Sequence, residues 1–299
     1  MNLTKRKIKI ENGETVAYID AGEGAPLILL HGNMSSSAYF KPLFERLAGY
    51  RLIAPDLRGM GDSSYERRFD SFKELAEDIK QFADALNISR AHVAAWSAGG
   101  AAALELAAAY PMLVKSLFLI ESASLRGFPV FPRKADGTYD PTPYKEKEGL
   151  RTDPVIGPCI TAFESQNRAF ISQLLELLIY PPPRPSESDC ALYIDEMLKQ
   201  RNLIDLDWAL AVLNMSDEPN AYRAGDGGYK KVKCPIALTT APLDMIVPRA
   251  MVEENLRAFP RAKLIEYEGC AHAPVFFCPD RLAEDIRAFL ADCEYNSLR

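Results

Sequence analysis

One short stretch of this sequence combines the residue types that a catalytic nucleophile requires. Ala95-Trp96-Ser97-Ala98-Gly99 matches the G-x-S-x-G pattern of a nucleophile elbow except at its first position, where alanine replaces glycine. An apolar run leads into Ser97 and an alanine-rich, helix-prone run leaves it, which is the context that an elbow needs. We therefore predict that Ser97 attacks an acyl carbon. The alternative is a serine that only caps the helix, because S-x-G alone is a weak signal.

A serine nucleophile needs a general base, and the chain has three histidines. His31 directly follows an apolar run, and we expect it to have a structural role in its loop. His92 precedes the run that leads into Ser97, so it belongs at the opposite end of that strand. His272 follows the last apolar run, and a parallel sheet brings the loops after its strands to one edge. We therefore predict that His272 is the base.

An acid must orient this histidine, and two carboxylates follow strand-like runs at the same edge. Asp244 comes after the run 235–241 and precedes His272 by 28 residues. The chain order Ser97, Asp244, His272 is the order that this kind of elbow predicts. Glu121, at the end of the run 116–122, is the alternative acid.

Two backbone N–H groups are candidates for an oxyanion hole. The residue after the nucleophile supplies one in this architecture, which here is Ala98. The loop after His31-Gly32 supplies the other, which we assign to Asn33. Two donors that point at one oxygen would stabilise a tetrahedral acyl-transfer intermediate.

The elements that must position these residues alternate between strand and helix, which predicts the α/β class. A hairpin over 7–22 has Asn12-Gly13 at its turn. Apolar runs that predict buried strands begin at residues 26, 50, 92, 116, 235 and 262, and helical patterns cover 71–87, 98–111 and 278–293. The alternation breaks over 124–233, where strand signals are weak and a helix is expected over 162–180. We therefore predict a core formed by 1–123 and 234–299, with 124–233 as a helical insertion.

Bulk composition excludes several other classes of protein. A net charge of -6 and a pI near 5.3 argue against nucleic-acid binding. No apolar run is long enough to span a bilayer, and the N-terminus lacks the apolar stretch of a signal peptide. The six cysteines form no C-x-x-C pair and no metal-ligand spacing. We expect a cytoplasmic protein without a metal or another cofactor.

Several motifs together resemble the α/β-hydrolase superfamily over nearly the full chain. They are His31-Gly32, APDLRGMGDSS at 54–64, the Ser97 elbow, LDMIVP at 243–248 and GCAHAP at 269–274. The resemblance implies a mostly parallel eight-stranded sheet flanked by helices, with 124–233 as a helical cap after the sixth strand. Serine at the nucleophile position disfavours haloalkane dehalogenases and epoxide hydrolases, which carry aspartate there. Ala273 stands where carbon–carbon bond hydrolases of the superfamily tend to have tryptophan.

The activity that follows from these residues is hydrolysis of a carboxylic ester with a small or medium apolar acyl or alcohol group. The expected partner is a small-molecule ester, with no nucleic acid and no membrane insertion. Alternatives are a lactone or hydroxyalkanoate-oligomer hydrolase, a non-hydrolytic lyase, and a binding protein without turnover. Five aromatic residues are candidates for the substrate pocket, although those of the cap could instead form its core: Trp96, Phe128, Phe131, Phe163 and Trp208.

Overall fold

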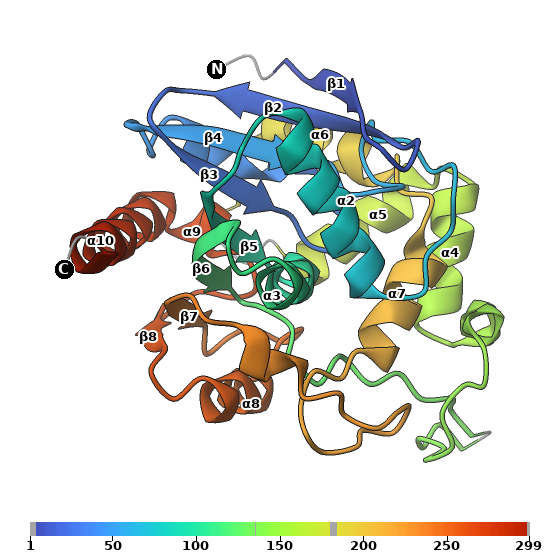
Figure 1. The fold of residues 1–299 in the computed structure, drawn as a ribbon. Helices are drawn as coiled ribbons and strands as arrows, with labels where there is room; N and C mark the ends of the chain where they lie inside the picture. Colours follow the sequence, from blue (N-terminus) through green and yellow to red (C-terminus); the bar gives the residue numbers. More distant parts are fainter. Residues whose placement is uncertain (1–3, 135, 180–183, 298–299) are drawn as a thin grey trace.

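The computed structural model describes residues 4–134, 136–179 and 184–297, and one central sheet organises them (Figure 1). Its strand order is β1-β2-β4-β3-β5-β6-β7-β8. The β1–β2 and β2–β4 pairs are antiparallel and the other pairs are parallel, so the predicted mostly parallel eight-stranded sheet is confirmed. The strands span Arg6–Lys9 (β1), Thr15–Ala21 (β2), Ala25–Leu30 (β3), Tyr50–Pro55 (β4), Ala91–Trp96 (β5), Val114–Ile120 (β6), Ile236–Thr240 (β7) and Lys263–Glu266 (β8).

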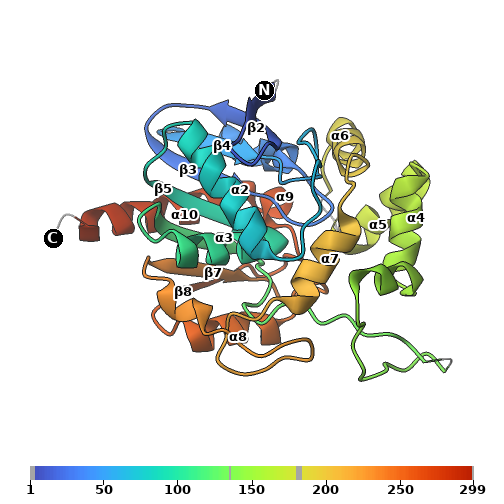
Figure 2. The same ribbon diagram turned by 45° about the vertical axis from the view of Figure 1, so that its right-hand side comes forward.

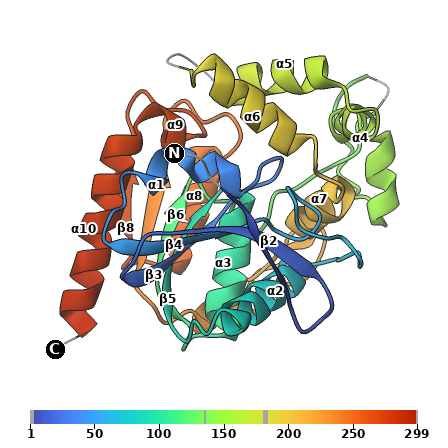
Figure 3. The same cartoon turned by 90° about the horizontal axis from the view of Figure 1, so that it is seen from above.

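Helices cover both faces of the sheet, which explains why its central strands are apolar without alternation. Alternate residues of β3 enter different cores: Ile28 and Leu30 enter one, and Leu27 and Leu29 enter the other. The first core includes α2 (Phe72–Ala85) and α3 (Ala98–Ala109), and the second includes α1 (Lys41–Phe44) and α10 (Pro279–Ser297). Viewed from above, α10 and α3 lie on opposite sides of the strands (Figure 3).

In the described residues between β6 and β7, where the sequence predicts a helical insertion, there are four α-helices. They are α4 (Ile156–Glu164), α5 (Arg168–Leu178), α6 (Glu187–Met197) and α7 (Leu203–Val212), and they form a group beside the sheet (Figure 2). Two 3-10 turns, η2 (Lys147–Thr152) and η3 (Gly228–Lys231), belong to the same stretch. The η3 turn packs against α3 rather than among the four helices.

The single helix expected over 162–180 is divided in two. Gln166 has φ 53, a left-handed conformation that interrupts a helix, and the Asn167 side chain accepts a hydrogen bond from the Phe170 backbone N–H. Asn167 therefore caps α5 as a new helix. Residue 180 lies outside the described residues.

Among the described residues, four helical segments outside the predicted insertion have no counterpart in the sequence predictions: η1 (Ser37–Phe40), α1, α8 (Arg249–Ala258) and α9 (Pro274–Phe277). The last of these directly follows the predicted catalytic histidine. In the part of the chain that the structure describes, no helix is both long and apolar enough to cross a membrane.

Candidate active site

The backbone of Ser97 adopts a conformation that is costly for a residue with a side chain. Ser97 has φ 55 and ψ -125 at the junction of β5 and α3. Its N–H donates to the Ile120 carbonyl at 2.9 Å, and its carbonyl accepts from Gly100 N–H at 2.9 Å. Ala95, which replaces the usual glycine, is fully buried within β5, so the additional methyl group does not prevent this sharp turn.

Two glycines after Ser97 allow α3 to start close to the strands. A Cβ atom on Gly99 would lie 2.5 Å from the backbone oxygen of His31. A Cβ atom on Gly100 would lie 1.9 Å from Oγ of Ser122. Any side chain at either position would push α3 outward, so these glycines are a steric requirement of the elbow.

His272 and Asp244 form a buried hydrogen-bonded pair. His272 Nδ1 lies 2.8 Å from Asp244 Oδ2, and the two side chains are 3% and 0% exposed. Asp244 Oδ1 accepts hydrogen bonds from the backbone N–H groups of Ile246 and Val247 at 2.8 and 2.9 Å. As an acceptor for Nδ1–H, Asp244 favours the tautomer of His272 that leaves Nε2 available as a base.

His272 and Ser97 line the same cavity. The hydrogen bonds of the described residues do not include one between them. Catalytic hydrogen bonds of this kind often tighten only when substrate binds.

Glu121, the alternative acid, lies nearby without contacting His272. Its carboxyl is fully buried, and Oε1 accepts a hydrogen bond from the Thr239 hydroxyl at 2.8 Å. The geometry therefore pairs His272 with Asp244.

Trp96 does more than the pocket lining that the sequence suggests. Its Nε1–H donates to the backbone oxygen of His272 at 2.8 Å, and the two rings are 5.6 Å apart. Trp96 also lines the cavity. The residue before the nucleophile thus holds the backbone of the candidate base, a role that sequence reasoning missed because it depends on a contact across 176 residues.

The loop after β3 carries Asn33, one of the two predicted oxyanion donors. His31 Nε2 accepts from Leu57 N–H at 3.0 Å, so Nδ1 carries the proton and donates to the Gly32 carbonyl at 2.9 Å. Burial lowers the pKa of His31, which keeps the ring neutral. Within the described part of the chain, neither the backbone N–H of Asn33 nor that of Ala98 donates a hydrogen bond.

The Asn33 side chain is committed to structural hydrogen bonds. Its Nδ2 donates to Asp207 Oδ1 at 2.8 Å, and its Oδ1 accepts from the Met34 backbone and from Gln200 Nε2, at 2.9 and 2.8 Å. Asp207 and Gln200 belong to the segment between β6 and β7. That segment therefore holds the predicted oxyanion loop through its side chains.

A cavity of about 390 Å³ opens onto Ser97 and His272. Aliphatic side chains dominate its wall. Asp207 is a polar residue in this wall. Burial raises the pKa of its carboxyl to about 7, and the hydrogen bond from Asn33 opposes this shift. The segment between β6 and β7 contributes Phe128, Val130, Val155, Ile156, Cys159, Leu174, Leu175, Leu178, Ile179, Met197, Asp207 and Leu210.

Of the five aromatic residues predicted for the pocket, Trp96 and Phe128 line this cavity. The other three do not, which corrects that part of the prediction. Phe131 and Trp208 pack near Tyr222, with ring centroids 6.4 and 5.7 Å away, and Phe163 borders a different cavity. Aromatic content does not reveal which face of a helix points inward, so the sequence could not separate these groups.

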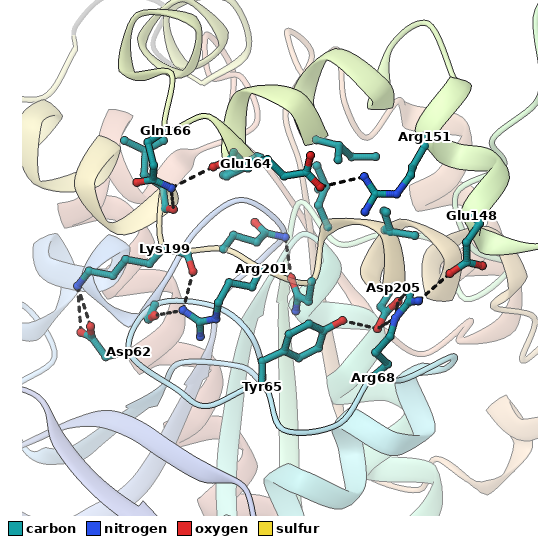
Figure 4. Close-up of a pocket in the computed structure, with 18 of the residues that line it drawn as sticks. Asp62, Tyr65, Arg68, Glu148, Arg151, Glu164, Gln166, Lys199, Arg201 and Asp205 are labelled. Atoms are coloured by element: carbon teal, nitrogen blue, oxygen red, sulfur yellow. Dashed lines mark hydrogen bonds and ion pairs between the residues drawn. The ribbon is translucent and has the colours of Figure 1, made fainter.

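That second cavity, of about 880 Å³, is larger but has a different character (Figure 4). Neither Ser97 nor His272 lines it. Its charged side chains neutralise one another: Arg68 pairs with Glu148 and Asp205, Arg151 with Glu164, and Lys199 with Asp62. Most of its charge is therefore already balanced, and the candidate catalytic residues lie elsewhere.

One acidic cluster has the spacing of a metal site. Ligand atoms of Asp56, Asp62 and Glu196 lie within 4.8 Å of one another. The Lys5 ammonium contacts all three, at 2.8 Å from Asp56 and 3.1 Å from Asp62. Burial lowers the pKa of Lys5, but Asp56 and Glu196 raise it by more. The ammonium group thus supplies the positive charge that a cation would bring.

Several known proteins are similar to this chain in sequence or in fold. The model of the alpha/beta hydrolase fold family matches residues 25–279. Lipase 1 of Psychrobacter immobilis is 26% identical over 96% of this chain and 84% of its own, and a pimeloyl-(acyl-carrier protein) methyl ester esterase of Neisseria meningitidis is 31% identical over 88% and 91%. The solved structure of a putative aryl esterase from Burkholderia cenocepacia superposes with a TM-score of 0.74 at 19% identity, over 98% and 100% of the two chains.

A sheet of this order with a strained serine after β5 defines the class of α/β proteins that carry a nucleophile elbow. The chain belongs to the α/β-hydrolase family.

Proposed function

We propose that this α/β hydrolase cleaves carboxylic esters through an acyl-enzyme on Ser97. The observation that carries the proposal is the buried His272–Asp244 pair, at 2.8 Å, on the same cavity as the strained Ser97. Relatives named lipase and methyl ester esterase support ester hydrolysis as the reaction class.

In the first step His272 Nε2 removes the proton of Ser97 Oγ while Oγ attacks the ester carbonyl carbon. The backbone N–H groups of Asn33 and Ala98 bind the resulting oxyanion, each worth roughly 3–4 kcal/mol. Collapse of the intermediate breaks the carbon–oxygen bond, and His272 gives its proton to the leaving alcohol. Asp244 stabilises the imidazolium between these transfers.

In the second step water replaces the alcohol. His272 removes a proton from the water, whose oxygen attacks the acyl carbon, and the proton then passes to Ser97 Oγ as the acid departs. The same two N–H donors serve both tetrahedral intermediates.

We propose residues 124–233 as a cap that determines substrate preference, with 1–123 and 234–299 as the core. Apolar side chains from α4 and α5 line the cavity: Ile156, Cys159, Leu174, Leu175 and Leu178. A cavity of about 390 Å³ with such walls suits a small or medium apolar acyl or alcohol group.

The test combines covalent labelling with turnover. A fluorophosphonate probe should label the wild-type protein at Ser97, and p-nitrophenyl esters from acetate to decanoate should be hydrolysed. Ser97→Ala should lose both properties, whereas Ser165→Ala, at an exposed serine of the cap, should keep both. Labelling without turnover on any ester or lactone would reject ester hydrolysis, and no labelling would reject Ser97 as the nucleophile.

A further inference from the structure

Glu121 has a buried carboxyl oxygen that the proposed reaction does not explain. It lies directly after β6 with φ 41, and its side chain is fully buried. Its backbone N–H donates to Thr239 Oγ1 at 2.9 Å, and the Thr239 hydroxyl donates back to Oε1 at 2.8 Å. Oε2 is buried without any hydrogen-bond partner among the described residues. An unsatisfied buried carboxylate oxygen is costly, so Oε2 requires a chemical explanation.

The neighbouring carboxyl is that of Asp244, which already has donors on both oxygens. Ile246 N–H and Val247 N–H donate to Oδ1, and His272 Nδ1 donates to Oδ2. Asp244 therefore acts as a hydrogen-bond acceptor through both oxygens. If Glu121 were ionised, it would place a second acceptor-only carboxyl beside Asp244, with no donor between them.

We propose that Glu121 is a positioning residue that carries a proton on Oε2 and donates it in a hydrogen bond to the carboxylate of Asp244. The role of Asp244 beside His272 is that of the proposed function, on which this inference rests. Because Oε1 accepts the Thr239 proton, Oε2 is the oxygen left to carry a proton of its own. This one proton gives Oε2 a hydrogen-bond partner and also removes the repulsion between two anions.

The charges around Glu121 agree with a neutral carboxyl at physiological pH. Burial raises the pKa of Glu121 to about 8 and the Asp244 charge adds to this effect, while the Thr239 hydrogen bond and the nearby backbone N–H of Ala241 oppose it. On the next loop, burial also raises the pKa of the Cys270 thiol, with Glu121 as a smaller cause, so that thiol is neutral as well. The charged groups that Glu121 meets are therefore Asp244 and, beyond it, His272.

The hydrogen bond gives Glu121 an effect on catalysis that depends on pH. Below about pH 8 the neutral acid holds Asp244 in the orientation that faces His272. Above that pH the proton leaves, and a second negative charge appears beside Asp244. Repulsion between the two carboxylates would turn Asp244 away from His272 and disturb the orientation of the general base, so activity should fall on the alkaline side.

The test compares Glu121→Gln with Glu121→Ala. Gln keeps a donor near Asp244 but cannot ionise, whereas Ala removes the donor. Glu121→Ala should lower kcat about ten- to a hundredfold, and Gln should restore most of that loss. The alkaline fall in kcat/KM should move to higher pH in the Gln variant.

Infrared difference spectra of wild type against Glu121→Gln give a readout that is independent of activity. Near pH 7 they should show the carbonyl stretch of a protonated carboxyl, and the band should vanish as pH rises past about 8. Absence of the band at pH 7, or a Gln variant no better than Ala with an unchanged alkaline limb, would overturn the proposal. An inactive wild type that shows the band would instead reject the ester-hydrolase function and leave the protonated Glu121 in place.

Discussion

A Cβ atom on Gly32 would lie 2.8 Å from Cβ of Ser97 and 3.3 Å from its Oγ. The proposed oxyanion loop and the proposed nucleophile are therefore in close contact, and only glycine at position 32 leaves room for the Ser97 side chain. Gly32→Ala should displace Ser97 and lower kcat/KM for p-nitrophenyl butyrate by about a hundredfold, while the melting temperature changes little. Gly149→Ala is a matched control, because its Cβ would make an equally short contact with the Tyr144 ring outside the cavity. Equal losses in both variants would contradict the steric argument.

The pairing of His272 with Asp244 predicts a large difference between the two acids. Asp244→Asn should reduce kcat by roughly 10³- to 10⁴-fold, because an amide no longer holds the required tautomer of His272. Glu121→Gln should cost far less. Steady-state kinetics near pH 7, with circular dichroism to check folding, measures the contrast. The reverse ranking would assign the acid to Glu121.

Asp207 predicts a pH-dependent change in stability. Its pKa is raised from 3.8 to about 7, so the folded protein keeps a proton that the unfolded chain releases between those values. The free energy of unfolding therefore falls as pH rises through that window and is constant above it. Asp207→Asn removes the titration but keeps an acceptor for Asn33, and should be more stable than wild type at pH 8 by up to about 4 kcal/mol.

Urea unfolding at pH 4 and pH 8 checks this expectation. The difference between wild type and Asp207→Asn should nearly vanish at pH 4. Asp292→Asn, at an exposed position of α10, should show no such dependence. A difference that grows toward low pH would refute the assignment.

The wall formed by α5 predicts a change in chain-length preference. Leu178 lines the cavity, whereas its neighbour Leu177 is 67% exposed. Leu178→Trp should fill part of the cavity and lower kcat/KM for decanoate about tenfold or more relative to acetate. Leu177→Trp should keep the wild-type profile. A Leu178→Trp profile that matches wild type would place the acyl chain elsewhere.

Two cysteines flank the candidate base. Sγ of Cys270 and Sγ of Cys278 are 3.3 Å apart, and His272 lies between them in the sequence. Diamide should join them in a disulfide, displace His272 and lower activity reversibly, with recovery in dithiothreitol. Burial raises the pKa of Cys270, and raises that of Cys278 to about 12, so oxidation should accelerate with pH. Cys278→Ser should be insensitive and Cys190→Ser should remain sensitive; continued loss in Cys278→Ser would assign the effect to another thiol.

Local physics explains how much of the candidate site could be predicted from the sequence. A sharp turn requires small residues around Ser97, and a parallel sheet brings its strand ends to one edge, so short motifs indicated Ser97, His272 and both possible acids. The strands could also be predicted from the sequence, because strands that are buried on both faces form continuous apolar runs.

Tertiary structure decided what depends on contacts between distant segments. It placed Asp244 rather than Glu121 against His272, engaged the Asn33 side chain with Asp207, and bound Trp96 to the His272 backbone. Three aromatic residues that the sequence suggested for the pocket do not line the cavity: Phe131, Phe163 and Trp208. Aliphatic residues from α4 and α5 line it instead. The sequence alone determined which reactive residues lie at the edge of the sheet, because the backbone geometry of the sharp turn restricts which residue types can stand there. The structure decided the choice of acid and the shape of the cavity, because side-chain packing over more than a hundred residues leaves no local pattern.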